Sequence, residues 1–548
     1  NKFLFNSKTE YHFNKSIKLG VQLDLFRKES GPFPEGPYGG PIPLAMKTSP
    51  IDKGVDREGN FIPTHTAFDQ NPLLVLDHMK YEDDMTNSYG FKPWLEVNLL
   101  PGLDVSTTLN ISKGQSHFKG YNPSYFLNQN FNRAQSELWE NRSEWFSWTW
   151  INLLKYSTTI NDTHRLRGTL GHEASFNENS GLGGMGLGVP QEENLRYMNL
   201  AKEYQDKISA WQGQSGTESY FGRAFYSFDD RYMITGTLRY DGSSKFSGDN
   251  KWGVFPSFGV SWRASEENFI QDLGIFSDLK LRYGWGRVGN QASAQGGSDV
   301  ANIGTYGMHY VLNNEVYKGG ITTNIPTPGL RWEVVETTNI GADLAFMQND
   351  LSVTLDYFMK DTKDMIQRVP LPGYYPKDRP NANVGTMSNE GYEMAVSYRK
   401  SIGDLNFSVG GNFSFLDNQV KTLNSEEEGA FVDAGYIDKL GNTTRTESGE
   451  EIAYFHGYET DGFFKTKDEI ANYSKGGELI QPDAAVGDIR FIDHNDNGEI
   501  DADDRTYLGS GTPDYVYGFN FSVDYRGIDV SGNFYGVGGN QIVRGSGI

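Results

Sequence analysis

The sequence predicts an all-β protein, a large transmembrane antiparallel β-barrel. Three observations lead to this prediction. Apolar and polar residues alternate with a period of two along most of the chain, which is the pattern of strands with one apolar face. The connections between these segments are alternately short and long, and aromatic residues gather near the segment ends. Tight turns on one side, long loops on the other and aromatic girdles are typical of membrane barrels.

About sixteen segments fit the alternating template. In the segment 350–360, for example, apolar Leu351 and Val353 oppose polar Ser352 and Thr354. Most segments contain about ten residues, the length with which a tilted strand crosses a bilayer. The predicted strands are 3–13, 17–26, 91–100, 103–112, 146–159, 164–176, 219–229, 231–241, 255–265, 278–287, 335–346, 350–360, 390–399, 404–415, 515–525 and 528–537.

The connections between these strands alternate in length. Short turns are expected at 14–16, 101–102, 161–163, 229–230, 348–349, 401–403 and 526–527. Long polar loops are expected at 27–90, 113–145, 177–218, 288–334, 361–389 and 416–514. The connection 242–254 is shorter than the other loops, and 266–277 is longer than the other turns. A soluble sandwich would scatter its connection lengths, so the alternation favours a barrel with periplasmic turns and extracellular loops.

Aromatic side chains support the same fold. Membrane barrels carry aromatic girdles at both interfaces with the bilayer. A soluble β-sandwich with aromatic cross-strand pairs is the alternative, and it leaves the unequal connections unexplained. The aromatic residues near predicted strand ends are Trp94, Trp148, Trp150, Tyr156, Tyr232, Tyr240, Trp262, Trp285, Tyr357, Tyr398 and Tyr525.

The composition excludes several classes of protein. The 548 residues carry a formal net charge of −22, and the mean hydropathy is −0.57. Abundant aromatic residues argue against disorder, and no stretch approaches the roughly 18 apolar residues of a spanning helix. An acidic chain without a basic stripe argues against nucleic-acid binding. With no cysteine there are no disulfides and no thiolate metal sites.

The two ends of the chain suggest a partial protein. The chain begins at Asn1 without methionine or a signal peptide and opens directly into an alternating segment. It stops at residues 545–548 without a closing element. We therefore expect residues 1–548 to form part of one barrel within a longer polypeptide.

One motif has the spacing of a metal site. Residues 493–504 fit the twelve-residue calcium loop, with oxygen-bearing side chains at positions 1, 3 and 5, glycine at 6 and a carboxylate at 12. Such a loop surrounds a hard cation with oxygens from one tight turn. The predicted calcium ligands are Asp493, Asn495, Asn497, Glu499 and Asp504, with Gly498 at the turn.

Two features of this loop differ from the calcium pattern. Position 12 is Asp504 rather than the longer glutamate, and the flanks 488–492 and 505–508 resemble strands rather than helices. The alternative is an Asx-rich turn whose side chains bond their own backbone. A structural calcium ion is therefore one of two hypotheses for this loop.

The remaining motifs provide no evidence for catalysis, so the sequence predicts that the protein is not an enzyme. Gly181–Gly186 matches a phosphate-binding pattern but does not join a strand to a helix, and we interpret it as a flexible loop. His164 and His172, the closest pair of histidines, lack zinc spacing. There is no GxSxG elbow, and the acidic run Ser425–Glu428 is typical of a solvated loop.

A series of blocks lies in a fixed order along the chain: Ser219–Tyr232, Arg239–Phe246, Trp252–Ser257, Leu281–Asn290, Trp332–Glu333, Thr337–Gly341, Asn383–Gly385, Asn389–Glu393, Thr460–Phe464, Gly487–Asp493, Asp504–Arg505, Gly509 and Pro513–Tyr515. Together these blocks resemble the SusC/RagA family of TonB-dependent outer-membrane transporters of Bacteroidetes-type bacteria. They cover most of residues 219–540, and residues 1–218 fit the family more loosely. The resemblance is specific because the blocks occur jointly.

The resemblance implies a complete barrel of about 22 strands, closed inside by an N-terminal plug domain that is not in this chain. It implies active import of a bulky nutrient, an oligosaccharide or a peptide, energised by TonB through the absent N-terminal part. A SusD-like surface lipoprotein would cap the extracellular side, in a dimeric SusC2D2-type assembly. The barrel would lie in outer-membrane lipid. The calcium-like loop falls in a stretch that the family shares.

A barrel of this size has a lumen too wide to select a solute by itself, so we expect the long loops to take part in selection. Aromatic residues in the loops are candidates for stacking on sugar rings or peptide side chains. Packing within the loops is the simpler role for them. These residues are Tyr121, Tyr125, Trp139, Trp211, Tyr374 and Tyr375.

Two other functions are compatible with part of the sequence. A passive sixteen-stranded porin has the right even number of strands, but the family blocks and the very long loops argue against it. A soluble adhesin or surface enzyme built from β-sandwiches would fold without detergent. The sequence does not distinguish a glycan from a peptide as the substrate.

Overall fold

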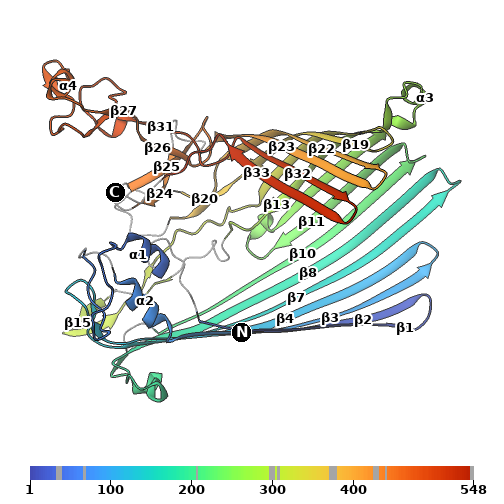
Figure 1. The fold of residues 1–548 in the computed structure, drawn as a ribbon. Coiled ribbons are helices and arrows are strands. Elements are labelled where there is room, and N and C mark those ends of the chain that lie inside the picture. Colours follow the sequence, from blue (N-terminus) through green and yellow to red (C-terminus); the bar gives the residue numbers. More distant parts are fainter. Residues whose placement is uncertain are drawn as a thin grey trace. The chain divides into compact units, whose positions relative to one another are not determined.

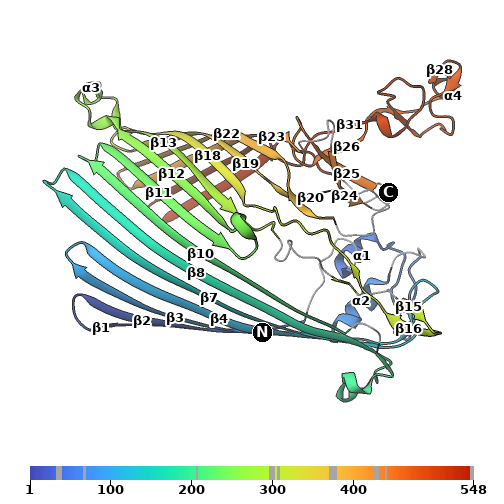
Figure 2. The ribbon, with the colours of Figure 1, turned by 180° about the vertical axis from the view of Figure 1, so that it is seen from behind.

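A computed structural model describes residues 1–31, 40–65, 70–204, 208–294, 303–304, 309–369, 379–423, 431–437 and 441–543. Sixteen long strands dominate it, and each coincides with one predicted segment (Figures 1 and 2). They are β1 (Lys2–His12), β2 (Ile17–Ser30), β3 (Glu82–Leu100), β4 (Leu103–Asn122), β7 (Glu137–Ile160), β8 (His164–Leu187), β10 (Ser209–Phe228), β11 (Tyr232–Ser243), β12 (Trp252–Arg263), β13 (Phe276–Asn290), β18 (Glu333–Phe346), β19 (Leu351–Lys363), β22 (Thr386–Ile402), β23 (Leu405–Thr422), β32 (Tyr515–Tyr525) and β33 (Ile528–Gly538).

Short elements lie in the connections. The short strands are β5 (Tyr125–Phe126), β6 (Asn132–Arg133), β9 (Glu203–Tyr204), β14 (Ile303–Gly304), β15 (His309–Leu312), β16 (Glu315–Lys318), β17 (Ile321–Thr322), β20 (Ile366–Arg368), β21 (Asn381–Asn383), β24 (Phe431–Ile437), β25 (Gly441–Glu447), β26 (Tyr454–Tyr458), β27 (Thr460–Phe463), β28 (Ser474–Lys475), β29 (Glu478–Leu479), β30 (Ile489–Phe491) and β31 (Arg505–Tyr507). The α-helices are α1 (Pro41–Lys47), α2 (Pro72–Met79), α3 (Asn268–Gln271) and α4 (Lys467–Asn472). The 3-10 helices are η1 (Glu193–Leu195), η2 (Met198–Leu200), η3 (Gly248–Lys251), η4 (Ala264–Glu266) and η5 (Ala502–Asp504). Within the described ranges, every helix is too short or too polar to cross a membrane.

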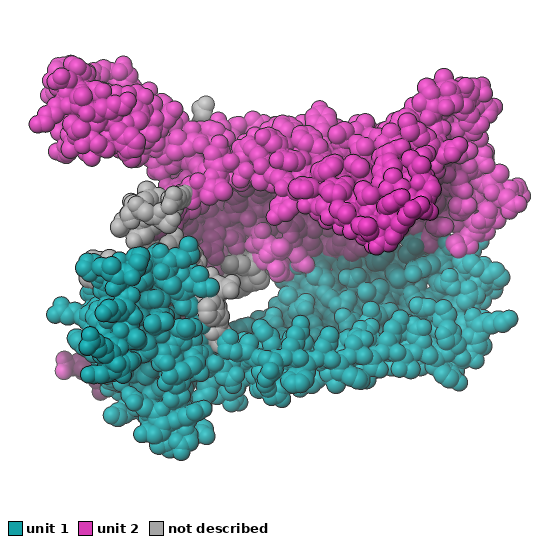
Figure 3. Space-filling model, in the orientation of Figure 1, with its two compact units in different colours: residues 1–156, 169–221, 242–244 teal, residues 157–168, 222–241, 245–548 magenta. Residues whose placement is uncertain are grey.

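The chain divides into two compact units (Figure 3). Unit 1 consists of residues 1–156, 169–221 and 242–244, and unit 2 of residues 157–168, 222–241 and 245–548. In unit 1, β1, β2, β3, β4 and β7 pair antiparallel in chain order. In unit 2, β12, β13, β18, β19, β22, β23, β32 and β33 do the same. Sequential antiparallel pairing agrees with the predicted wall of a membrane barrel.

The long strands continue into the predicted loops, which corrects the loop boundaries. β4 runs to Asn122 instead of ending at residue 112, and β7 begins at Glu137 instead of residue 146. The loops predicted at 27–90, 177–218, 288–334, 361–389 and 416–514 also lose residues to their flanking strands. The added stretches are largely polar, so they lack the alternation by which the strands were predicted. Backbone hydrogen bonds extend the pairing there, and isolated apolar side chains such as Tyr121 and Leu138 are buried.

The short turns lie where the sequence predicts them. Asn161 and Asp162 have φ values of 51° and 56°, and Asp229 and Asp230 have 54° and 49°. Two successive residues with positive φ are typical of tight hairpin turns, in which Asn and Asp are well tolerated. The longer turn predicted at 266–277 contains α3, and η4 immediately precedes it after β12.

The aromatic residues predicted to form girdles share the apolar face of the sheet, with Trp94 as the exception. Tyr357, for example, lies opposite Ile340. Trp94 lies in the interior of β3 and pairs with Gly20 on β2. Its neighbour Leu95 is on the apolar face, so Trp94 projects to the other face. A Cβ atom at residue 20 would lie 2.0 Å from the Trp94 ring, so glycine makes room for it. The girdle prediction for Trp94 is wrong because it used position along the strand and not the face.

Two buried clusters hold the connecting segments. In unit 2 the cluster joins the 242–254 connection to the segments near 294, 330 and 366. In unit 1 it joins β4, β7 and the segment after β8. The unit 2 cluster contains Phe246, Phe255, Ala294, Leu330, Trp332 and Ile366. The unit 1 cluster contains Tyr121, Leu138 and Val189, with Tyr81 and Ala201 packed against it.

Gly391 on β22 shows how closely the strands pack. It lies opposite Phe358 on β19 and Leu416 on β23. A Cβ atom at this position would lie 2.2 Å from the backbone oxygen of Phe415 and 2.6 Å from the Phe358 ring. A carbonyl of the sheet cannot move away without breaking the ladder, so a side chain at residue 391 forces the strands apart.

We therefore predict that Gly391→Ala destabilises the full-length protein by about 1–3 kcal/mol, the usual cost of overpacking. Unfolding in detergent, followed by heat-modifiable gel mobility, measures the change. Gly284→Ala is the matched control, because a Cβ atom at residue 284 meets nothing within 4 Å, and we expect a change within about 0.5 kcal/mol. Equal stability of the two variants would contradict this packing.

Candidate functional site

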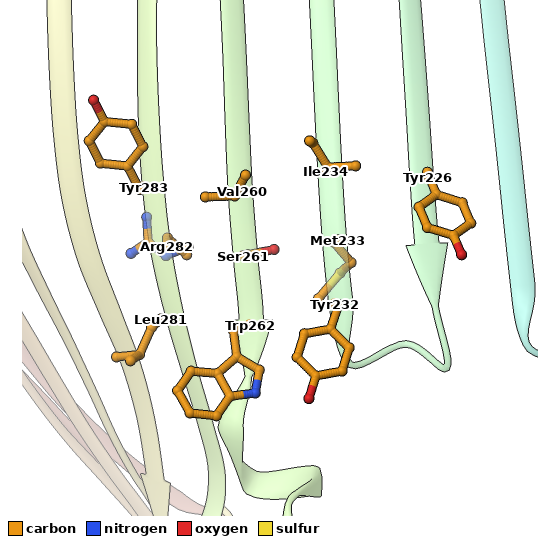
Figure 4. Close-up of a pocket in the computed structure, with 10 residues that line it drawn as sticks. All are labelled: Tyr226, Tyr232, Met233, Ile234, Val260, Ser261, Trp262, Leu281, Arg282 and Tyr283. Carbon is orange, nitrogen blue, oxygen red and sulfur yellow. The ribbon is translucent and has the colours of Figure 1, made fainter.

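The sheet has one apolar face, which Figure 4 shows on β10 to β13. The register of β12 and β13 places Trp262 opposite Leu281 and Val260 opposite Tyr283. Together with Tyr226, Tyr232 and Ile234, these side chains line a shallow groove of about 430 Å³. Exposed apolar side chains at alternate strand positions form a surface suited to lipid contact.

The opposite face carries an ion-pair network. The Arg282 guanidinium donates through Nε to Asp343 Oδ2 at 2.8 Å and through Nη2 to Asp356 Oδ2 at 3.1 Å. Thr354 Oγ1 donates to Asp343 Oδ1 at 3.4 Å. The register places Gly341 between Arg282 and Asp356, and a Cβ atom there would lie 2.7 Å from Arg282 Cζ. The glycine therefore lets one arginine bridge carboxylates on two neighbouring strands.

Further round the same face, small polar side chains lie among charged ones, since Ser408 is opposite Arg399 on β22 and Asp524 is opposite Asp529. The Ser408 and Ser522 hydroxyls lie 2.9 Å apart on β23 and β32. Asn520 lies opposite Gly410 on one side and Asn533 on the other. Hydroxyl and amide groups both donate and accept hydrogen bonds. This part of the polar wall therefore offers hydrogen bonds to a neutral solute.

A four-stranded sheet of β24, β25, β26 and β31 stands in the long connection between β23 and β32. Arg445 Nε donates to Asp433 Oδ1 at 2.9 Å, and its guanidinium lies 3.7 Å from the centroid of the Phe431 ring. The Tyr454 hydroxyl donates a hydrogen bond to Glu447 Oε1. Burial, helped by that carboxylate, raises the pKa of Tyr454. The segment is therefore an ordered module with its own sheet and side-chain contacts, and not an irregular loop.

His456 lies inside this module with 6% of its surface exposed. Its Nδ1 atom has no hydrogen-bond partner among the described residues. Arg505 Nη2 donates to the His456 backbone oxygen at 2.8 Å. Burial lowers the pKa of His456, and the neighbouring charges of Arg445 and Arg505 lower it further. The folded module therefore favours the neutral imidazole.

The side chains of the calcium-like loop bond to its own backbone. Asp493 accepts from Asn497 N at 3.0 Å and from Gly498 N at 2.8 Å. Asn495 Oδ1 accepts from Asn497 N, and Asn497 Oδ1 accepts from Glu499 N, both at 2.9 Å. These are the hydrogen bonds of the Asx-rich alternative. Residues 493–499 thus form a turn that is stabilised by its own side chains.

Asp504, at position 12 of the loop, is fully buried. It accepts from His494 N at 2.9 Å, Asn495 N at 3.3 Å and Asp501 N at 2.8 Å. Burial works against its charge, but these N–H donors outweigh burial and lower the pKa of the carboxyl. The described residues contain no group of three or more His, Cys, Asp or Glu side chains placed to hold a metal ion. Calcium binding by Asp493, Asn495, Asn497, Glu499 and Asp504 stays a prediction.

The aromatic residues proposed for ligand stacking differ in their surroundings. Tyr121 is 2% exposed and belongs to the unit 1 cluster, with the Arg196 guanidinium 4.2 Å from its ring centroid. Tyr125 packs against His78, with ring centroids 5.1 Å apart. Trp211 is 53% exposed. Tyr121 therefore packs the loops, whereas Trp211 presents its ring to solvent.

Other predictions fall on less open positions or outside the described residues. Trp139 is partly buried on β7. Tyr374, Tyr375 and the acidic run Ser425–Glu428 lie outside the described residues.

The glycine pattern at 181–186 is wrongly predicted as a loop. It belongs to β8, whose polar outer end obscures the alternation. His164 and His172 also lie on β8 but have separate partners. The His164 ring lies 2.9 Å from Tyr226 OH, and the His172 ring lies 3.5 Å from Glu218 Oε1.

Comparisons with known proteins agree with this architecture. The family model described as TonB dependent receptor-like, beta-barrel matches residues 37–540. The TonB-dependent receptor P39 of Formosa agariphila is 26% identical over 99% of this chain and 53% of its own length. The TonB-dependent receptor SusC of Bacteroides thetaiotaomicron is 29% identical over 84% of this chain and 44% of its own length. The chain thus spans about half the length of the curated relatives it matches.

A solved structure shares the fold. The RagAB peptide transporter superposes with a TM-score of 0.78 over 98% of this chain and 58% of that chain, at 20% identity. The chain belongs to the TonB-dependent receptor-like β-barrel family, and its similarity to SusC agrees with the resemblance predicted from the sequence blocks. It is therefore an outer-membrane β-barrel chain, and the apolar face of its strands is suited to contact with lipid.

The calcium hypothesis makes a direct prediction. If the loop binds calcium, saturating Ca²⁺ will raise the melting temperature of the full-length protein relative to EDTA, by the equivalent of about 2.7 kcal/mol at one hundred times Kd. Asp493→Ala will abolish this rise. Asp503→Ala is the control, because position 11 is not a ligand position. An unchanged melting temperature in wild-type protein would contradict calcium binding and support the Asx-rich turn without a metal ion.

The depressed pKa of His456 predicts a pH dependence for the loop module. Below the ordinary histidine pKa near 6.5, the unfolded segment binds a proton that the folded module does not yet bind. Stability therefore falls as the pH drops from about 6.5 toward the lower folded pKa, by at most about 1.4 kcal/mol per pH unit.

Hydrogen exchange of residues 441–458 between pH 7.5 and 5.5, corrected for intrinsic exchange rates, measures this effect. His456→Gln removes the titrating group, so its protection in this window will change less with pH than that of wild type. The same pH profile in both proteins would show that other groups control the module.

Proposed function

We propose that this chain forms most of the barrel wall of an active outer-membrane importer for a bulky nutrient. In the full-length protein, TonB would supply the energy through the part that precedes this chain. The proposal rests on family membership and on the relationship to SusC and RagAB. It assigns the protein a transport role and not an enzymatic one.

The observation that supports this proposal best is the combination of a polar face on the long strands with ordered modules in the long connections. The wall pairs its charges, as in the Arg282 network, and offers neutral hydrogen-bonding groups near Ser408 and Ser522. The module around His456 gives the long connection between β23 and β32 a defined shape. A passive pore needs no such structures above its mouth, whereas a selective importer of large solutes does.

The substrate class that fits this chemistry is an uncharged or weakly charged oligosaccharide or peptide. Small polar side chains on the wall can exchange hydrogen bonds with sugar hydroxyls or peptide amides alike. The exposed ring of Trp211 offers a stacking surface to either ligand. We propose a SusD-like surface lipoprotein as the extracellular partner, in a dimeric SusC2D2-type assembly.

The ligand can be identified directly. The full-length protein is isolated from its native outer membrane in mild detergent, and co-purifying molecules are analysed by mass spectrometry. The proposal expects an oligosaccharide or peptide together with a lipoprotein of the SusD type. Recovery of the barrel without either one, under conditions that preserve a related complex, would count against the assembly.

The energy requirement separates active import from the passive-porin alternative. We predict that uptake of the identified ligand by cells carrying the full-length protein falls to background when TonB is removed, because release into the periplasm needs work done on the barrel. Uptake of labelled ligand over time is the measurement, and surface binding at low temperature is the control. Undiminished uptake without TonB would support a porin.

A further inference from the structure

A row of polar side chains crosses the apolar face of unit 1. Thr107 on β4 lies opposite Asn152 on β7. Asn152 Nδ2 lies 3.2 Å from His172 Nδ1 on β8, and the His172 ring packs against Tyr220 on β10 with centroids 5.0 Å apart. Four long strands therefore contribute to one row. Glu218, two residues before Tyr220 on β10, adds a carboxylate to it.

Hydrogen bonds and one histidine–carboxylate contact connect the row from end to end. Trp150 Nε1 donates to Thr107 Oγ1 at 2.9 Å, and Thr107 Oγ1 donates to Asn152 Oδ1 at 2.8 Å. Beyond the contact between Asn152 and His172, His172 Nε2 lies 3.5 Å from Glu218 Oε1. Such a connected network holds its members in fixed positions.

Tyr220 completes the row on β10. Its hydroxyl donates to Glu218 Oε1 at 2.6 Å. The Trp150 ring meets His172 edge-on at 5.8 Å between centroids. The carboxylate therefore lies at one end of a series of three aromatic rings.

The row lies on the face that meets lipid. In the pairing of β4 with β7, the neighbouring pair on the same face is Val105 and Leu154. Leu170, two residues before His172 on β8, is 61% exposed. A polar network with a carboxylate is out of place on this surface, because charged groups on the lipid face of a barrel are destabilising.

Glu218 remains available to an external cation. Its side chain is 46% exposed, and among the described residues its only ion pair is with His172. Trp150 and Tyr220 are 44% and 47% exposed. Aromatic faces beside an accessible carboxylate recognise an ammonium group through cation–π attraction and an ion pair.

We propose that this row binds the headgroup of an outer-membrane lipid that carries a primary ammonium group. Glu218 is the anionic ligand, Tyr220 and Trp150 provide the ring surface, and the Thr107–Asn152–His172 network holds them in place. The acyl chains lie along neighbouring apolar residues such as Leu154 and Leu170. The inference rests on the lipid-facing placement of the row and does not depend on the substrate or on TonB.

The test uses native mass spectrometry of the full-length protein released from nanodiscs of defined composition. The probes are phosphatidylethanolamine, which has a primary ammonium group, phosphatidylcholine, which has a quaternary one, and phosphatidylglycerol, which has none. We expect wild-type protein to retain phosphatidylethanolamine about fivefold more than either other lipid, the effect of one exposed ion pair with a cation–π contact. Equal retention of the three lipids by wild-type protein overturns the proposal without any variant.

Glu218→Gln will abolish the preference for phosphatidylethanolamine. Glu178→Gln is the matched control, because Glu178 is also on the outer part of the sheet but accepts hydrogen bonds from Gln212 and Gln214, and it will keep the preference. Retained preference in Glu218→Gln contradicts the assignment of Glu218. A shift from dimer to monomer in Glu218→Gln, with lipid retention unchanged, would identify the row as an interface between copies and overturn lipid binding.

Discussion

The whole structure depends on one constraint: inside a membrane, every backbone N–H and C=O group must find its partner within the protein. Long antiparallel strands satisfy it by pairing along their length, as β13 does with β18. Once the backbone is satisfied in this way, alternate side chains are free to be polar. Tyr283 and Ile340 thus meet lipid on one face, while Arg282 and Gly341 pair on the other. The acidic, polar average of the chain follows from this division.

Glycine and aromatic residues are abundant for a shared steric reason. Gly20 lies under Trp94 and Gly114 lies under Trp145, and in both cases an added Cβ atom would lie 2.0 Å from the ring. A large ring on one strand covers a glycine on the next, so the pair fills its space without bending the ladder. Gly341 serves a charged group in the same way. Glycine and aromatic residues therefore pack as pairs on neighbouring strands.

All sixteen long strands were predictable, because alternation reports a face that must be apolar. The sequence could not show the parts of the strands that lack this alternation. The outer ends of β4 and β8 are largely polar or glycine-rich, so 113–122 and 181–186 resembled loops, although Tyr121 and Met185 are buried there. The clusters around Trp332 and Tyr121 escaped prediction because their members are far apart in the chain. The loop at 493–504 was located from its Asp and Asn spacing, since those side chains bond locally, but spacing does not distinguish a turn from a cation site.

The long strands continue beyond their apolar part. Substitutions and insertions therefore have different consequences in the embedded part and in the outer ends. Within the membrane, the alternation of apolar and polar side chains along each strand sets the register. A slip of one residue there would expose polar groups to lipid. Above the band the ladder continues with no such penalty, and insertions at its tips leave the embedded part untouched. A lineage can therefore replace the modules in its long connections while it inherits the same wall.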